Sequence, residues 1–242
     1  MLGVARSRRL ADMHLMIPNL TYEDRRRSLG RLALWWVETF SIIGRGDAIN
    51  KPVTHSPEYI QFYLNAYALK PNGRRRFNRV SLWRPKGCNK SGLGNDIALF
   101  EAFGPCRFDH WAKAGETYTF LGQTYYYLPG EPVGRPIQNP EILCLATSED
   151  QSGNIFDSIY YNCMSGPLAQ LQGFGMEATK TRIGLPEGGE IIPSTSGDAS
   201  KDGGLETFAL MDETHLYTLP KHHSMYKTVQ RNLPKRSLNA DP

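Results

Sequence analysis

Apolar residues recur at helical spacing in two segments near the start of the chain. In the first, residues 21–24 read as a capping box, Thr-Tyr-Glu-Asp, at the start of a helix. Four apolar residues then follow three to four positions apart: Leu29, Leu32, Trp36 and Phe40. The second pattern begins at Ser56-Pro57 and closes at Pro-Asn-Gly, residues 71–73. We therefore expect an N-terminal helical lead-in over residues 1–73.

Beyond residue 73 the pattern changes to short strands that alternate with helices. Strands are predicted at 79–84, 142–146 and 208–211. The helical stripes between them are Leu93, Ile97 and Phe100, and Ile155, Ile159 and Cys163. Strands that alternate with helices are typical of parallel pairing through crossover helices. The order predicts an α/β domain over residues 74–242 with a mostly parallel central sheet.

Two segments interrupt this alternation. Residues 107–140 are rich in Tyr, Gly and Pro and predict a β-hairpin inserted into the α/β order. Residues 181–185 and 190–192 flank the sequence Pro-Glu-Gly-Gly, which is a second hairpin signal.

Composition narrows the class of protein. Hydrophobic residues make up 40% of the chain and charged residues 21%, which is typical of soluble globular proteins. The longest fully apolar stretch, residues 32–37, is far shorter than the roughly 18 residues that a membrane span needs. Four scattered cysteines without a C-x-x-C pair argue against a zinc site and a disulfide framework. We expect a cytoplasmic protein without membrane contact.

Residues 84–91, with the sequence Arg-Pro-Lys-Gly-Cys-Asn-Lys-Ser, lie between a predicted strand and a predicted helix, where a phosphate-binding loop belongs. In that role Lys90 would reach the β and γ phosphates and Ser91 would ligate Mg²⁺. The standard pattern has glycines in place of Arg84 and Asn89. Asn89 is a plausible replacement because asparagine tolerates the left-handed backbone conformation. The loop candidates for nucleotide binding are Lys86, Gly87, Cys88, Asn89, Lys90 and Ser91.

Four apolar residues at 208–211 run directly into Asp212 and Glu213, which is the form of a Walker B strand. Its aspartate would hold Mg²⁺ and the glutamate would polarise the attacking water. Taken alone, each motif favours the simpler interpretation, a surface Asp-Glu pair after a core strand or a Lys-Ser turn, since short motifs often match by chance. Together, in the expected structural context, they indicate nucleotide hydrolysis.

Several runs of the sequence together closely resemble the N-terminal ATPase part of bacteriophage terminase large subunits, especially the branch found in phages of actinobacteria. The runs are WRPKGCNKSGLGNDIALFEAFGPCRF, ATSEDQSGNIFDSIYYN, TRIGLPEGGEIIPSTSGDASKDGG, TFALMDETHLYT and QRNLPKR. The resemblance implies a three-layer P-loop NTPase of the additional-strand, catalytic-Glu (ASCE) type. It also implies Mg²⁺-dependent ATP hydrolysis that translocates double-stranded DNA into the procapsid, in the host bacterial cytoplasm at the portal.

The same resemblance implies partners and further roles. The partners are double-stranded DNA, the portal protein, the small terminase subunit and further copies of the chain in a ring. A nuclease domain usually follows the ATPase part and is not expected within these 242 residues. By matching positions, Lys86 contacts the γ-phosphate, Ser91 and Asp212 hold Mg²⁺, and Glu213 is the catalytic carboxylate.

Other implied roles have more than one candidate. Ser148, Glu149 and Gln151 match the coupling region, and the adenine contact is Tyr59 by alignment or Gln61 by chemistry. A trans-acting cation that completes a neighbour's site is either Arg182 or Lys201. Candidates for DNA phosphate contacts are the clusters at Arg25 to Arg27, at Arg74 to Arg76 with Arg79, and at Arg231 with Lys235 and Arg236. The cluster at 74–79 is preferred because it precedes the predicted phosphate loop, whereas Arg25 to Arg27 are better explained as a solvated helix face. The alternative function is a nucleotide-binding or assembly module derived from a terminase that does not hydrolyse ATP, because Asn89 distorts the loop.

Overall fold

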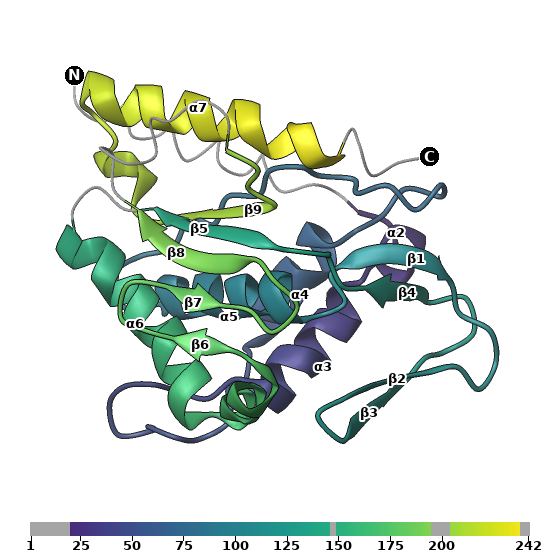
Figure 1. Cartoon of the computed structure of the whole chain (residues 1–242). Helices are drawn as coiled ribbons and strands as arrows, with labels where there is room; N and C mark the ends of the chain where they lie inside the picture. The colour runs from purple at the N-terminus through teal and green to yellow at the C-terminus, as the bar shows by residue number, and fades with distance from the viewer. Residues whose placement is uncertain (1–19, 146–148, 195–203, 238–242) are drawn as a thin grey trace.

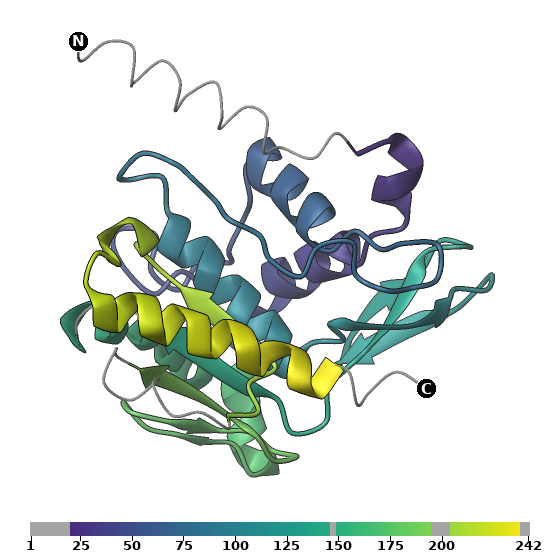
Figure 2. The same ribbon diagram turned by 90° about the horizontal axis from the view of Figure 1, so that it is seen from above.

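The computed structural model describes residues 20–145, 149–194 and 204–237, and within them three layers are stacked (Figure 1). A central sheet lies between helix α7 (Pro220–Ser237) on one face and helices α5 (Lys90–Phe103) and α6 (Glu149–Ser165) on the other. Seen from above, α7 covers the sheet and runs roughly along its strands (Figures 1 and 2). None of the described helices is long and apolar enough to cross a membrane.

The sheet has five strands in the order β6-β7-β8-β5-β9. Their bounds are β6 Glu177–Ala178, β7 Ile183–Gly184, β8 Glu190–Ser194, β5 Glu141–Leu145 and β9 Phe208–Met211. Strand β5 is parallel to both β8 and β9, whereas β6, β7 and β8 pair antiparallel. The expectation of a mostly parallel sheet is therefore corrected to a mixed sheet. The tight turn between β7 and β8, predicted from Pro-Glu-Gly-Gly, makes that pair antiparallel.

Alternation along β5 explains the layers. Ile142 and Cys144 face the main core with α5 and α6, whereas Leu143 and Leu145 face a smaller core with Met225 of α7. Successive side chains of a strand point to opposite faces, so a continuous apolar run is stable only when both faces are covered.

The N-terminal segment forms separate helices instead of one long first helix. The predicted capping box is present: Thr21 and Asp24 hydrogen-bond reciprocally at the start of α2 (Tyr22–Arg26). The chain breaks after α2, and α3 (Gly30–Phe40) and α4 (Pro57–Ala66) then pack against each other. Ser28 fixes the break because its hydroxyl donates to the carbonyl of Leu64 and accepts from the Gly30 N–H. These helices share one hydrophobic core with α5 and α6, and the expected domain boundary at residue 73 stays a prediction.

The predicted inserted hairpin is confirmed. Strands β2 (Thr117–Phe120) and β3 (Gln123–Tyr126) pair antiparallel, and β1 (Arg107–Trp111) pairs with β4 (Pro132–Arg135) beside them. The ring of Tyr125 packs against Trp35, and Tyr127 is buried, while Tyr126 is 75% exposed. Most of this tyrosine run therefore serves packing.

Two parts of the chain differ from the sequence-based expectation. Residues 79–84, predicted as a strand, contain no strand. Helix α7 was not predicted at all. The remaining elements are two short 3-10 helices, η1 (Pro167–Phe174) and η2 (Thr214–Leu216).

Candidate functional site

Ser91 and Asp212 lie together at one end of the sheet. Helix α5 begins at Lys90, and Asp212 follows the last residue of β9, so both side chains stand at element ends. The Ser91 hydroxyl donates a hydrogen bond to Asp212 Oδ2 at 2.5 Å. The pairing of the two sequence motifs in space is thus present in the structure.

The close packing of α5 on β9 makes this contact possible. A Cβ added at Gly94 would lie 2.7 Å from Leu210 Cδ1, which is closer than real Cβ atoms approach. The Leu210 side chain therefore fills the space beside Gly94, and α5 packs on β9 so that its first turn reaches the strand's carboxyl end.

The loop before α5 has the backbone conformation of a turn. Gly87 has a φ of 88° and Asn89 a φ of 52°, both in the left-handed region. The Lys90 ammonium donates to the Pro85 carbonyl at 3.0 Å, while Lys86 is exposed. Backbone N–H groups at the start of a helix, with the positive end of its dipole, form a site suited to anions.

Asn89 is accommodated by a glycine one turn along α5. Its side chain lies over Gly92, where an added Cβ would be 2.3 Å from Asn89 Oδ1. The asparagine backbone adopts the left-handed conformation that a glycine at this position also reaches. Asn89, which replaces the glycine of the standard loop, therefore occurs together with a glycine at position 92 that leaves room for its side chain.

The Tyr59 hydroxyl donates a hydrogen bond to the Cys88 carbonyl and so ties α4 to the loop. Burial raises the pKa of Tyr59, which keeps the hydroxyl protonated as a donor. Gln61, the other adenine candidate, is engaged within its own helix, where its amide donates to Asn65 Oδ1 at 2.9 Å. Of the two candidates, Tyr59 is the one in contact with the loop.

Glu213 follows Asp212 in a left-handed conformation, with a φ of 48°. Its backbone N–H donates to Asp212 Oδ1 at 2.8 Å, and its side chain is exposed. The two adjacent carboxylates therefore differ in their contacts. Asp212 accepts hydrogen bonds from the Ser91 hydroxyl and the Glu213 N–H, whereas the Glu213 side chain is exposed.

The remaining candidates lie away from this contact or outside the described residues. Arg182 stands in the turn between β6 and β7, three strands from β9, and pairs with Glu190. Lys201 and Ser148 lie outside the described residues, and the described structure covers the backbone of Glu149 and Gln151 within α6 but not their side chains.

Arg75 and Arg76, proposed for DNA phosphates, are engaged inside the protein. Arg75 pairs with the buried Glu101 at 2.7 Å, and Arg76 pairs with Asp24 at 2.6 Å. These two arginines form ion pairs within the protein, so the charge of the predicted cluster at 74–76 is partly neutralised by Glu101 and Asp24.

Sequence reasoning missed two buried carboxylates on α5. Glu101 accepts from Arg75, Arg107 and the Tyr67 hydroxyl. Although burial opposes ionisation, Arg107 and Arg75 lower the pKa of Glu101 to about 2. The signal in the sequence was a charged residue inside the apolar stripe of α5.

The second buried carboxylate, Asp96, lies 3.6 Å from His55 Nε2, while His55 Nδ1 lies 3.1 Å from Glu38. Burial opposes the charged imidazole, yet the carboxylates of Asp96 and Glu38 raise the pKa of His55. Glu101 and Asp96 together attach the helix that carries the loop to the rest of the core.

Metal ligands are few in this region. No group of three or more His, Cys, Asp or Glu side chains suited to a metal occurs among the residues that the structure describes. The Ser91 hydroxyl and the Asp212 carboxylate are nevertheless a hard-oxygen pair, which suits Mg²⁺. That ion usually takes one or two protein oxygens and completes its shell with phosphate and water.

Comparison with known proteins gives phage relatives. The chain is 26% identical over 184 residues to the Gene 13 protein of Mycobacterium phage L5 and 25% identical over 184 residues to that of Mycobacterium phage D29. Each match covers 74% of this chain and 28% of the relative, so the chain corresponds to under a third of their length. No family model matches the chain.

Among solved structures, the large terminase of bacteriophage HK97 matches 84% of this chain with a TM-score of 0.59 and 18% sequence identity. The match covers 36% of that terminase. The resemblance to phage large terminases is thereby confirmed at the level of fold, and its actinobacteriophage character agrees with the two mycobacteriophage relatives.

Proposed function

We propose, from the large-terminase fold as premise, that this chain is the ATPase part of a phage DNA-packaging motor. It hydrolyses ATP with Mg²⁺ and drives double-stranded DNA into the procapsid. The observation that carries the proposal is the hydrogen bond of 2.5 Å between Ser91 and Asp212. It joins the last residue of the loop motif to the aspartate that follows strand β9, as a shared metal site requires.

The loop would hold the triphosphate. The amides of Gly87, Cys88 and Asn89 and the start of α5 suit the phosphate oxygens, and Lys90 and Lys86 supply positive charge. Lys90 would exchange its contact with the Pro85 carbonyl for the phosphates. Ser91 and Asp212 would hold Mg²⁺, which neutralises charge on the transferred phosphoryl group.

Glu213 is the residue proposed to orient the attacking water. It directly follows the metal-holding aspartate and is exposed, so its carboxylate is accessible from solvent. Phosphoryl transfer needs little covalent participation from the protein, and catalysis by these residues would consist of positioning and electrostatic stabilisation. Tyr59 would hold the loop in place through its hydrogen bond to the Cys88 carbonyl. Its ring, and not the Gln61 amide, would contact the adenine.

A motor of this kind is proposed to work as a ring in the host cytoplasm, with portal protein and small terminase subunit as partners. Arg182 or Lys201 would complete the site of a neighbouring copy. For Arg182 this requires release from Glu190, because the ion pair occupies it within its own chain.

ATP hydrolysis distinguishes the proposed motor from the alternative function, a nucleotide-binding module that does not hydrolyse ATP. The test measures phosphate release and Mg-ATP binding for the wild type and for Glu213→Gln, in the presence of DNA at a concentration that promotes assembly. We expect the variant to bind Mg-ATP and to lose phosphate release. Binding without phosphate release by the assembled wild type would favour the module.

A further inference from the structure

Positive charge is concentrated in two parts of this chain. Helix α7 contains five Lys or Arg residues and no Asp or Glu, so it supplies +5 in a chain whose net charge is +4. Residues 59–95 contain eight Lys or Arg residues and again no acid. A modest overall charge therefore conceals two strongly basic segments.

These two segments meet in space. The Arg79 guanidinium donates to the Tyr226 hydroxyl at 3.5 Å and lies 5.9 Å from the centroid of that ring. Arg79 belongs to the stretch that runs directly into the loop at 84–91, and Tyr226 belongs to α7. The basic helix is thus attached to the lead-in of the phosphate loop.

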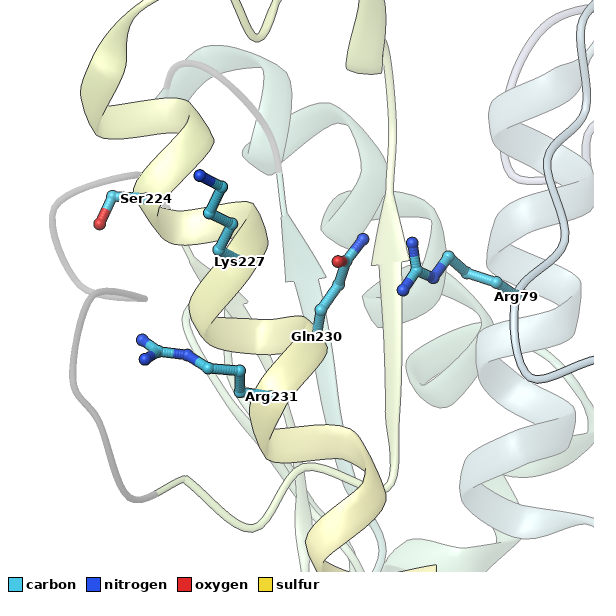
Figure 3. Close-up of a pocket in the computed structure, with 5 residues that line it drawn as sticks. All are labelled: Arg79, Ser224, Lys227, Gln230 and Arg231. Carbon is cyan, nitrogen blue, oxygen red and sulfur yellow. The ribbon is translucent and has the colours of Figure 1, made fainter.

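A shallow, open groove of about 420 Å³ lies at this junction. It is lined by Arg79, Ser224, Lys227, Gln230 and Arg231, and Figure 3 shows Arg79 and Gln230 reaching toward one another. Ser224 and Arg231 project from α7 on the side away from Arg79 (Figure 3), and the Arg231 guanidinium donates to the Thr228 hydroxyl at 3.3 Å. None of its lining residues belongs to the loop or to the Walker B candidate.

The groove has the chemistry of a phosphate surface. Lys227 and Arg231 are exposed and one helical turn apart, where two like charges disfavour the helix unless an anion lies between them. No acidic residue lines the groove within the part of the chain that the structure describes. Of the neighbouring arginines, Arg75 and Arg76 are held by Glu101 and Asp24, which leaves Arg79 to face α7.

We propose that the groove formed by Arg79, Lys227 and Arg231 binds the phosphate backbone of double-stranded DNA. Single-strand binders use exposed aromatic rings on which bases stack, and none of the five lining residues is aromatic. A duplex presents one phosphate per about 1.7 Å of axis, so a row of cations along a helix meets several phosphates without reading sequence. This inference rests on the proposed function, which makes DNA the translocated substrate.

The test is fluorescence anisotropy with a labelled 30-base-pair duplex of mixed sequence, titrated with the full chain at low and at physiological salt. The groove variant is Lys227→Gln/Arg231→Gln, with Arg79→Gln as a second variant. The matched control is Lys113→Gln/Lys180→Gln, which removes the same charge from two exposed lysines outside the groove. Circular dichroism establishes that each variant is folded.

We expect the groove variant to lose about tenfold or more in affinity, with a salt slope shallower by about 2, since each lost phosphate contact removes about 0.9 from it. The control should change affinity less than twofold. Equal losses in the two double variants, or no duplex binding by the wild type, would overturn the proposal. The proposal would also be overturned if the wild type bound a single strand more tightly than the duplex and the groove variant kept that single-strand binding.

Mg-ATP binding by the same variants separates this inference from the proposed function. The groove variants should bind Mg-ATP as the wild type does, because no groove residue belongs to the loop. Loss of DNA binding with intact nucleotide binding supports the groove. Absence of Mg-ATP binding in the wild type would contradict the proposed function and leave the duplex result to stand on its own.

Discussion

Ser91 and Asp212, which are 121 residues apart in the chain, are joined by a hydrogen bond of 2.5 Å. The contact exists because α5 packs directly on β9 and each residue stands at an element end. In the proposed function, this hydroxyl and carboxylate would be the protein ligands of Mg²⁺. The account of this chain as an ATPase depends on that arrangement and on the loop that precedes it.

The pairing of Asn89 with Gly92 makes a prediction specific to this sequence. Gly92→Ala would place a Cβ 2.3 Å from Asn89 Oδ1, so it should displace this exposed asparagine side chain and weaken Mg-ATP binding. Adding Asn89→Gly should restore binding, because the clash is then removed. Calorimetric titration of the single and double variants measures this.

Gly173→Ala is the matched control, because nothing lies within 4 Å of a Cβ added there. It should bind Mg-ATP as the wild type does. If the double variant is as weak as Gly92→Ala, the two residues are not coupled and the account of the loop's unusual sequence is wrong.

Glu101→Gln should destabilise the fold. The substitution leaves Arg75 and Arg107 near a neutral side chain in the core, and breaking a buried ion pair typically costs about 3–5 kcal/mol. Urea denaturation gives the free energy of unfolding. Glu187→Gln, at an exposed position, should stay close to the wild type.

The free energy of unfolding should also depend on acid pH through Glu101. The pKa of Glu101 is about 2 in the folded chain, against an ordinary value of 4.5. Its contribution to stability is therefore present above pH 4.5 and is lost as the pH falls toward about 2. Glu101→Gln should lack this part of the acid dependence, and an unchanged acid profile would contradict it.

His55 makes a prediction of the opposite sign. Glu38 and Asp96 raise the pKa of His55, so the folded chain binds the proton more tightly than the unfolded chain. The stabilisation is complete below the ordinary value of 6.5 and is lost as the pH rises through the raised value. The free energy of unfolding, measured by urea between pH 5 and pH 9, should show this loss in the wild type.

His55→Gln should abolish that loss above pH 6.5, while His223→Gln, at an exposed position, should keep it. A wild-type stability that is flat or rises across this range would show that the imidazole is not charged in the folded chain.

The motif residues were predictable because their pattern is local. Strand 208–211 and the start of α5 follow from short apolar runs and from a loop sequence, and both were found at the expected positions. The prediction of a strand at residues 79–84 is wrong. Its side chains are largely exposed, with Val80 46% and Trp83 63% exposed, and Arg79 and Arg84 contact Tyr226 and Glu58 of two helices. The segment therefore lies outside the sheet, and the edge of β9 away from β5 pairs with no described strand.

Helix α7 and the buried carboxylates of α5 escaped prediction for different reasons. The buried side of α7 includes His222, Thr228 and Asn232 beside Met225 and Val229, so it presents no clear apolar stripe. The position of Glu101 in the apolar stripe of α5 signals burial, but the partners of the two carboxylates, Arg75 and Arg107 for Glu101 and His55 for Asp96, lie in other segments of the chain. Pairwise electrostatics across a core is not encoded in local periodicity.

The most direct test of the account is a calorimetric titration of Mg-ATP into the wild-type chain and into Lys90→Ala, with Lys180→Ala as control. The account predicts saturable binding by the wild type and the control, and its loss in Lys90→Ala. No binding by the wild type at millimolar ATP, or binding that Lys90→Ala retains, would contradict the assignment of the loop as the nucleotide site.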